Sequence, residues 1–297
     1  MKETEHHHHE VSGKNLGFAI VLNIGITLTQ AIGGIISGSM ALISDAAHNF
    51  SDVLSLIISY IANRLAKREA TVKQTFGFRR SEILAAFINS ATLIIISVII
   101  LFEAIQRLFN PIPISANLVI YLALAGIFVN GISVLFIKND SHKNLNIKSV
   151  YLHLLGDMLT SVAVLLGGFA MKYLQWFWTD SVFSIGIAFY LLYMSWGIVR
   201  SSLRIIMQFT PEEIDVQKIV NEIENIQGVK NIHHIHVWQI NEHDLMFEAH
   251  IDLSEDVKIS SFEKILDNIK VVLSHYNIDH STIQPEFTVD DNKQIIH

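Results

Sequence analysis

The chain has 297 residues, of which 51% are hydrophobic and only 16% are charged. This composition is apolar for a soluble protein and normal for a membrane protein with a soluble appendage. The formal net charge of −7 gives no indication of nucleic-acid binding. Because the chain contains no cysteine, disulfides and thiolate metal sites are excluded, and any metal site must use histidine and carboxylates.

The first 15 residues form a polar segment that does not look like a cleaved signal peptide. It contains four consecutive histidines, His6, His7, His8 and His9. We expect a disordered cytoplasmic tail, and the histidines are either a weak metal-collecting group or a purification tag.

Six apolar segments follow, and each is long enough to cross a hydrocarbon core of about 30 Å at about 1.5 Å per residue. They are residues 16–36, 40–62, 83–105, 116–137, 150–171 and 182–199. Lysine and arginine are concentrated after the second, fourth and sixth segments. The positive-inside rule therefore predicts a multi-pass protein with both termini in the cytoplasm, and we expect it in a bacterial plasma membrane.

From residue 209 the composition changes, and residues 209–297 are predicted to form a small cytoplasmic α+β domain. The expected order is a helix over 212–226, strands over 229–240 and 245–253, a helix over 259–275 and a strand over 278–287. Thr210-Pro211-Glu212-Glu213 is expected to open the first helix, and residues 241–244 to form the turn between the first two strands.

Two of the apolar segments carry the same pair of ionisable residues. His48 and Asp52 are four residues apart in the second segment, as are His153 and Asp157 in the fifth, and this spacing puts each pair on one helical face. A lone intramembrane histidine is often only hydrogen-bonded to a neighbour, but the repetition favours a tetrahedral site for a divalent metal, zinc first. Asp45 either orients His48 or is a plain helix-entry residue.

The predicted C-terminal domain has its own group of histidines. The first strand carries His233, His234 and His236, the second carries His250, and His280 and Glu286 lie about the third. Strict alternation would put His234 and His236 on one face and His233 on the other, with His250 near one of these faces. Half-buried histidines are common on small sheets, but three histidine-bearing strands favour a second metal site.

Four motifs stand out: Ser44-Asp45-Ala46-Ala47-His48-x-x-x-Asp52, Thr75-Phe76-Gly77-Phe78-Arg79-Arg80-Ser81-Glu82, His153-x-x-x-Asp157 and His233-x-x-His236-Val237-Trp238. Through them the sequence resembles the zinc-exporting branch of the cation diffusion facilitator family over about residues 16–287. The resemblance implies homodimers of six-span subunits, with metallochaperone-like cytoplasmic domains, that export divalent metal against protons. It also implies a transport site at His48, Asp52, His153 and Asp157, and a cytoplasmic site at His233, His250 and Glu286.

Three features depart from that family. Residues 71–78 contain neither aspartate nor histidine, so the loop metal site of some members is expected to be absent. Residues 139–147 contain only His142, where some members have a histidine-rich loop. Many members have an acidic residue at the position of Gln208, so the charged contact between membrane domain and cytoplasmic domain is in question.

We therefore predict a secondary transporter, with residues 16–208 as the membrane domain, that exchanges zinc-like cations for protons by alternating access. An intramembrane hydrolase is disfavoured because the chain has no His-Glu-x-x-His motif and no extra acid beside the four ligands, so we do not expect an enzyme. A primary pump would need a phosphate-binding loop, which the sequence lacks. A metal sensor is disfavoured only by the central position of the four ligands.

Overall fold

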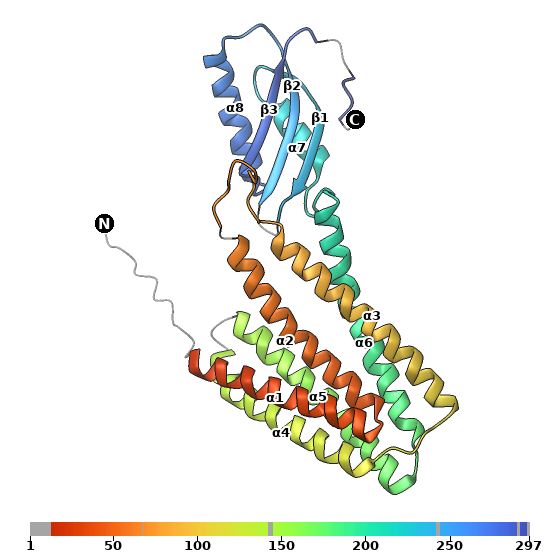
Figure 1. Cartoon of the computed structure of the whole chain (residues 1–297). Helices are drawn as coiled ribbons and strands as arrows, with labels where there is room; N and C mark the ends of the chain where they lie inside the picture. The colour runs from red at the N-terminus through yellow and green to blue at the C-terminus, as the bar shows by residue number, and fades with distance from the viewer. Residues whose placement is uncertain (1–12, 67, 142–144, 242–243, 290–291, 296–297) are drawn as a thin grey trace. The chain divides into compact units, whose positions relative to one another are not determined.

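The computed structural model describes residues 13–66, 68–141, 145–241, 244–289 and 292–295 (Figure 1). The predicted tail with His6, His7, His8 and His9 lies outside these residues, as do His142 and His243. The chain forms two compact units. One comprises residues 1–58 and 88–197, and the other comprises residues 59–87 and 198–297.

Long helices contain each of the six predicted apolar segments. They are α1 (Gly13–Ser37), α2 (Met40–Ala66), α3 (Ser81–Phe109), α4 (Ala116–Ser141), α5 (Leu145–Leu174) and α6 (Trp178–Ile206). Within the described residues, four stretches are long and apolar enough to cross a membrane: 81–109, 116–135, 155–174 and 178–206. Ile24–Ser37 is a shorter apolar helical stretch. The predicted helical membrane domain is confirmed.

Apolar side chains hold the helices of the first unit together, and α4 packs along both α1 and α5. The shared core includes Leu42 of α2, Val119 of α4, Val164 of α5 and Leu191 of α6, all buried. Large apolar side chains of α3, such as Phe102, are instead exposed on the protein surface. Such a surface suits contact with lipid. A helix satisfies its backbone hydrogen bonds internally, so only its apolar side chains face the lipid.

Gly126 of α4 allows a close approach of polar side chains from α1 and α5. A Cβ atom at this position would lie 2.7 Å from Nε2 of Gln30 and 3.0 Å from Oγ of Ser161. A residue with a side chain would therefore push these two groups aside, whereas glycine leaves room for both. Both groups donate hydrogen bonds to Asp45 of α2.

A carboxylate on α6 caps the N-terminus of α2. Asp180 accepts hydrogen bonds from the backbone N–H groups of Met40 and Ala41, at 2.7 and 3.3 Å, and from the hydroxyl of Ser39. The first N–H groups of a helix have no partner within the helix, and a negative charge there is favourable. Asp180 therefore fixes where α2 begins.

The C-terminal domain has the predicted αββαβ order. β1 (Val229–Gln239) pairs antiparallel with β2 (Leu245–Leu253), which pairs parallel with β3 (His280–Glu286). α7 (Val216–Glu224) precedes β1, and α8 (Ile259–Ser274) provides the crossover that a parallel pair requires. The two helices contact each other and lie against the sheet, as Figure 1 shows.

Isoleucines and leucines spaced four apart bury the helices of this domain against the sheet. Ile219 and Ile223 of α7, and Ile265, Ile269 and Leu273 of α8, share one core with apolar residues of β1 and β2. Each such side chain contributes about 1.5–3 kcal/mol when it is fully buried. This core fixes the positions of β1 and β2, the strands that carry most of the histidines.

The first helix of the domain begins later than predicted. Asp215 has an extended conformation, and its carboxylate accepts a hydrogen bond from the backbone N–H of Lys218, so α7 begins at Val216. The prediction that Thr210 to Glu213 open the helix is wrong, because Asp215 is the residue that caps the free N–H groups.

The predicted alternation of histidines along β1 holds only in part: the rings of His234 and His236 do lie together, with centroids 5.2 Å apart, but His233 is not separated from them as predicted. The pairing of β1 with β2 shifts between His233 and His236, and His234 has a φ of 53°, in the left-handed region. This bulge brings the rings of both His233 and His234 next to His250, with centroids 5.6 and 4.7 Å away. A bulge inserts an extra residue and so breaks the period of two.

Charged contacts are present near Gln208 although this residue itself has no charge. Arg204, at the end of α6, donates to the carbonyl of Thr210 at 3.0 Å and pairs with Glu212 at 3.3 Å. Arg79 pairs with Asp244, in the turn after β1, at 2.9 Å. These contacts connect residues 198–206 and the loop of residues 68–80 with the C-terminal domain, within the second unit.

Candidate metal sites

Three of the four predicted transport ligands lie close together between α2 and α5. Nδ1 of His48 is 3.5 Å from Oδ2 of Asp52, and Nε2 of His48 is 3.2 Å from Oδ1 of Asp157. One donor atom from each residue lies within 4.8 Å of the others. Asp157 is buried, while His48 and Asp52 are partly buried.

The fourth predicted ligand, His153, lies in α5 one turn before Asp157. Its side chain is outside the part of the chain whose side chains are described. The proposed ligands whose side chains are described are therefore the imidazole of His48 and the carboxylates of Asp52 and Asp157, on the apolar helices α2 and α5. Nitrogen and oxygen donors of this kind bind zinc and similar divalent ions, and a cation would balance the two negative charges.

Two further residues surround this cluster. The ring of Tyr190, on α6, meets the ring of His48 edge to face, with centroids 6.2 Å apart. Asp45 is fully buried and accepts hydrogen bonds from Gln30 at 3.0 Å, Thr160 at 2.7 Å and Ser161 at 3.3 Å. Asp45 therefore ties α1 and α5 to α2, beside His48. The sequence pointed to Asp45 through its spacing from His48, but nothing in it pointed to Tyr190 or to the three donors.

A second cluster lies on the sheet of the C-terminal domain. Oε1 of Glu286 is 2.8 Å from Nδ1 of His250, and Oε2 is 3.3 Å from Nε2 of His233. One donor atom of each residue again lies within 4.8 Å of the others. Nδ1 of His233 lies 2.9 Å from the side-chain oxygen of Asn231. A proton on Nδ1 leaves the lone pair of His233 on Nε2, the atom that faces Glu286, so Asn231 orients the imidazole as a ligand.

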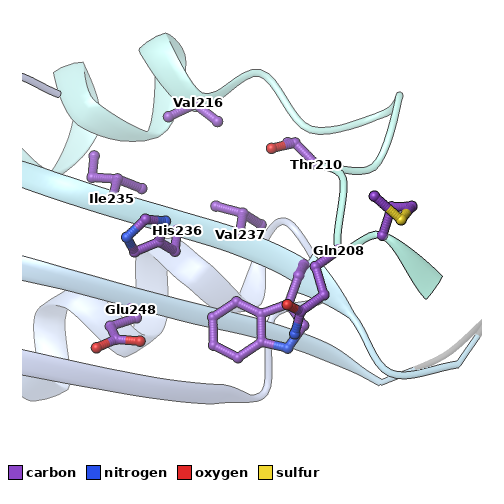
Figure 2. Close-up of a pocket in the computed structure, with 9 residues that line it drawn as sticks. Gln208, Thr210, Val216, Ile235, His236, Val237 and Glu248 are labelled. Atoms are coloured by element: carbon purple, nitrogen blue, oxygen red, sulfur yellow. The ribbon is translucent and has the colours of Figure 1, made fainter. Parts of the chain in front are cut away.

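The other histidines of this domain lie elsewhere or at the margin. His236 is exposed and lines a different hollow of about 560 Å³, together with Gln208, Thr210, Val216 and Glu248 (Figure 2). His236 and Glu248 are cross-strand partners on β1 and β2. His280 is exposed at the start of β3. His234 stacks on His250 and is not among the three clustered ligands.

Two residues next to the second cluster, Lys293 and Asp252, could not be predicted from the sequence. Nζ of Lys293 lies 3.0 Å from Oδ1 of Asp252 and 3.1 Å from Oε2 of Glu286. Lys293 comes from the C-terminal segment, which returns to β1 after a connection that no local pattern describes. A lysine near the end of the sequence does not by itself indicate a contact with Asp252 or Glu286.

Comparison with known protein families shows which family the first part of the chain resembles. The family described as the cation efflux transmembrane domain matches residues 16–207. The chain belongs to the cation efflux family. The family described as the cation efflux protein cytoplasmic domain, a dimerisation domain, matches residues 211–287. The predicted family is thereby confirmed, as is the prediction of a membrane-embedded transporter rather than an enzyme.

Named relatives cover almost the whole of this cation efflux protein. A "cadmium, cobalt and zinc/H(+)-K(+) antiporter" of Bacillus subtilis is 38% identical over 284 residues, which is 95% of this chain and 91% of the relative. The "zinc transporter ZitB" of Escherichia coli is 31% identical over 93% of this chain and 88% of its own. The "metal cation efflux system protein CzcD" of Cupriavidus metallidurans is 32% identical over 94% and 89%. Each of these names describes transport of metal cations, and the CzcD name specifies efflux.

Proposed function

We propose that this cation efflux protein is a secondary transporter that exports zinc and similar divalent cations from the cytoplasm in exchange for protons. Its transport site would comprise His48, Asp52, His153 and Asp157. The observation that carries the proposal is the contact of the α2 and α5 residues: donor atoms of His48, Asp52 and Asp157 lie within 4.8 Å of one another. Ionisable residues inside apolar helices usually mark an ion pathway.

The same residues support coupling to protons. A zinc-like ion needs a neutral imidazole and ionised carboxylates, so metal binding releases protons and proton binding weakens metal binding. Histidine has an ordinary pKa of about 6.5, which allows this exchange near neutral pH. Rearrangement of α2 against α5 would separate the ligands and expose the site to alternate sides of the membrane.

The names of the relatives support the range of ions. Zinc is in the names of the Bacillus and Escherichia proteins, and the Bacillus name adds cadmium, cobalt and antiport with protons and potassium. We take zinc as the main substrate of this chain, with cadmium and cobalt as further substrates. The His48 imidazole favours these ions over magnesium or calcium, which prefer oxygen ligands alone.

We further propose that both termini lie in the cytoplasm and that the protein is a homodimer in a bacterial plasma membrane. The orientation is supported by basic residues at one end of the spans: Arg64 in the last turn of α2, Lys73, Arg79 and Arg80 between α2 and α3, and Arg200 and Arg204 near the end of α6. The dimerisation domain supports the homodimer. The chain lacks cysteine, so single cysteines can be introduced. In intact cells, an impermeant thiol reagent should label a cysteine at Ile112 and not one at Gln294, and the reverse pattern would refute the orientation.

The C-terminal cluster is proposed as a regulatory metal site. His233, His250 and Glu286 supply two nitrogens and a carboxylate on three adjacent strands, a donor set that fits zinc. Their role would be to bind zinc from the cytoplasm and to adjust the dimer accordingly. The histidines His6, His7, His8 and His9 would form a weak collecting tail ahead of the transport domain.

The test is a flux measurement on the purified protein in sealed vesicles that trap a zinc indicator and a pH indicator. A step to an acidic lumen should drive zinc in and protons out, and protein-free vesicles should show neither. Repeating the step with and without potassium separates proton exchange from potassium exchange. Zinc binding without flux would overturn the proposal in favour of a sensor.

A further inference from the structure

A lysine ammonium lies among the proposed ligands of the C-terminal metal site. Nζ of Lys293 is 3.1 Å from Oε2 of Glu286, 3.0 Å from Oδ1 of Asp252 and 3.4 Å from Nε2 of His233. The side chains of Glu286 and His233 are almost fully buried, at 3% and 0% exposed. The ammonium thus provides positive charge beside two carboxylates at a partly buried position, since the side chains of Lys293 and Asp252 are 31% and 13% exposed.

The ammonium faces the same atoms that a metal ion would use. Oε2 of Glu286 and Nε2 of His233 lie 3.3 Å apart, and Nζ of Lys293 is close to both. A zinc ion would bind these atoms at about 2.0–2.2 Å. An ammonium at its present position would then lie close to a divalent cation at a partly buried site, where water screens the repulsion less than it does at the surface. Occupation by Lys293 and occupation by metal are therefore mutually exclusive.

Backbone contacts hold Lys293 in this position. The N–H groups of His234 and Ile235 in β1 donate to the carbonyls of Gln294 and Ile295, at 3.1 and 2.8 Å. These donors lie at the β1 bulge, where the pairing with β2 shifts. Ile295 also packs against the core of the domain. The bulge that places the histidines beside His250 thus also binds the segment that carries the lysine.

We propose that Lys293 is an intramolecular competitor for divalent metal at the His233, His250 and Glu286 site. This inference rests on the proposed metal site. Metal binding displaces the ammonium from Glu286 and His233 and loosens the segment 292–295 from β1. The lysine weakens the apparent metal affinity, so the site fills only when the cytoplasmic metal concentration is high.

The test measures zinc binding by the full-length protein in detergent, with Asp157→Asn present throughout to weaken the membrane site. A competing chromophoric chelator reports affinity. Lys293→Gln should bind zinc about tenfold more tightly than the parent, because loss of a charge-assisted contact changes an equilibrium constant by that order. Lys293→Arg should stay near the parent, and the matched control Lys270→Gln, at an exposed lysine of α8, should have no effect.

A second readout follows the segment itself. A spin label on Gln294→Cys, the only thiol in the chain, should become more mobile when zinc is added. Adding His250→Ala should abolish both the tight binding of Lys293→Gln and the change in mobility. Equal zinc affinity of the parent and Lys293→Gln overturns the inference while the metal site stands. Absence of zinc binding in both proteins overturns the metal site and the inference together.

Discussion

The hydroxyl of Thr160 on α5 donates a 2.7 Å hydrogen bond to Oδ1 of Asp45 on α2. Asp45 lies one helical turn before His48, and Thr160 lies one turn after Asp157. The bond therefore joins the two helices next to the His48–Asp157 contact. We infer that Asp45 and Thr160 position the two proposed ligands for each other.

Removing this bond should lower both stability and metal affinity. Thr160→Val removes the donor, and Asp45→Asn removes the negative charge that strengthens the bond while keeping one oxygen to accept it. Hydrogen bonds to charged groups contribute about 1.5–3 kcal/mol, so Thr160→Val should destabilise the protein by this order and Asp45→Asn by up to as much. Since the two residues share one bond, the double variant should lose less than the sum of the single variants. Thr160→Val should also raise the zinc concentration for half-maximal flux, whereas Thr160→Ser, which keeps the hydroxyl, should not. Additive stability losses would show that the two residues are not coupled.

The Asp180 cap of α2 yields a prediction of a different kind. Asp180→Asn removes the negative charge but keeps one oxygen to accept from Met40 or Ala41. The expected loss is about 1–2 kcal/mol, observed as a lower thermal midpoint at a fixed scan rate. Flux per folded molecule should be retained, because Asp180 is not a proposed ligand. Asp256→Asn, at an exposed loop position, is the control and should leave the midpoint unchanged.

The choice of metal should depend on His48. His48→Asp changes the proposed ligands from two nitrogens and two oxygens to one nitrogen and three oxygens. Imidazole suits zinc, and carboxylates suit harder ions such as manganese. The ratio of zinc flux to manganese flux should therefore fall in the variant, measured in matched vesicles. An active variant with an unchanged ratio would mean that His48 does not contact the ion.

The C-terminal cluster is expected to regulate transport rather than to conduct it. Replacing His250 and Glu286 by alanine should weaken cytoplasmic zinc binding and leave part of the flux, because the predicted spans do not include these residues. The measurement pairs equilibrium zinc binding with initial flux at several zinc concentrations. Complete loss of flux in a folded double variant would make the cluster obligatory for transport.

The helices and the site residues differ in how far the sequence could predict them. Long apolar segments and the repeated His-x-x-x-Asp spacing are local patterns, so α1 to α6 and the pairing of His48 with Asp157 could be anticipated. The αββαβ order was equally readable from alternating strands and helical spacing. The start of α7 was wrong, because a single capping residue, Asp215, determines where this helix begins.

Contacts between distant segments could not be predicted in this way. The bulge at His234 depends on a positive φ that strand alternation does not foresee. The Lys293 contact requires the chain to return to β1 after β3, and the Asp45 contacts require α1, α2 and α5 to meet at Gly126. Each of these features arises from tertiary packing. A single sequence has no local pattern that predicts such contacts between distant segments.

The most direct test of the transport site is zinc flux by Asp157→Asn in sealed vesicles driven by a pH step. The substitution keeps the size of the side chain and removes the charge that lies 3.2 Å from His48. Asp256→Asn makes the same chemical change at an exposed position and should transport normally. We predict that Asp157→Asn folds as a dimer and moves neither zinc nor protons. Normal zinc flux by a folded Asp157→Asn protein would contradict it.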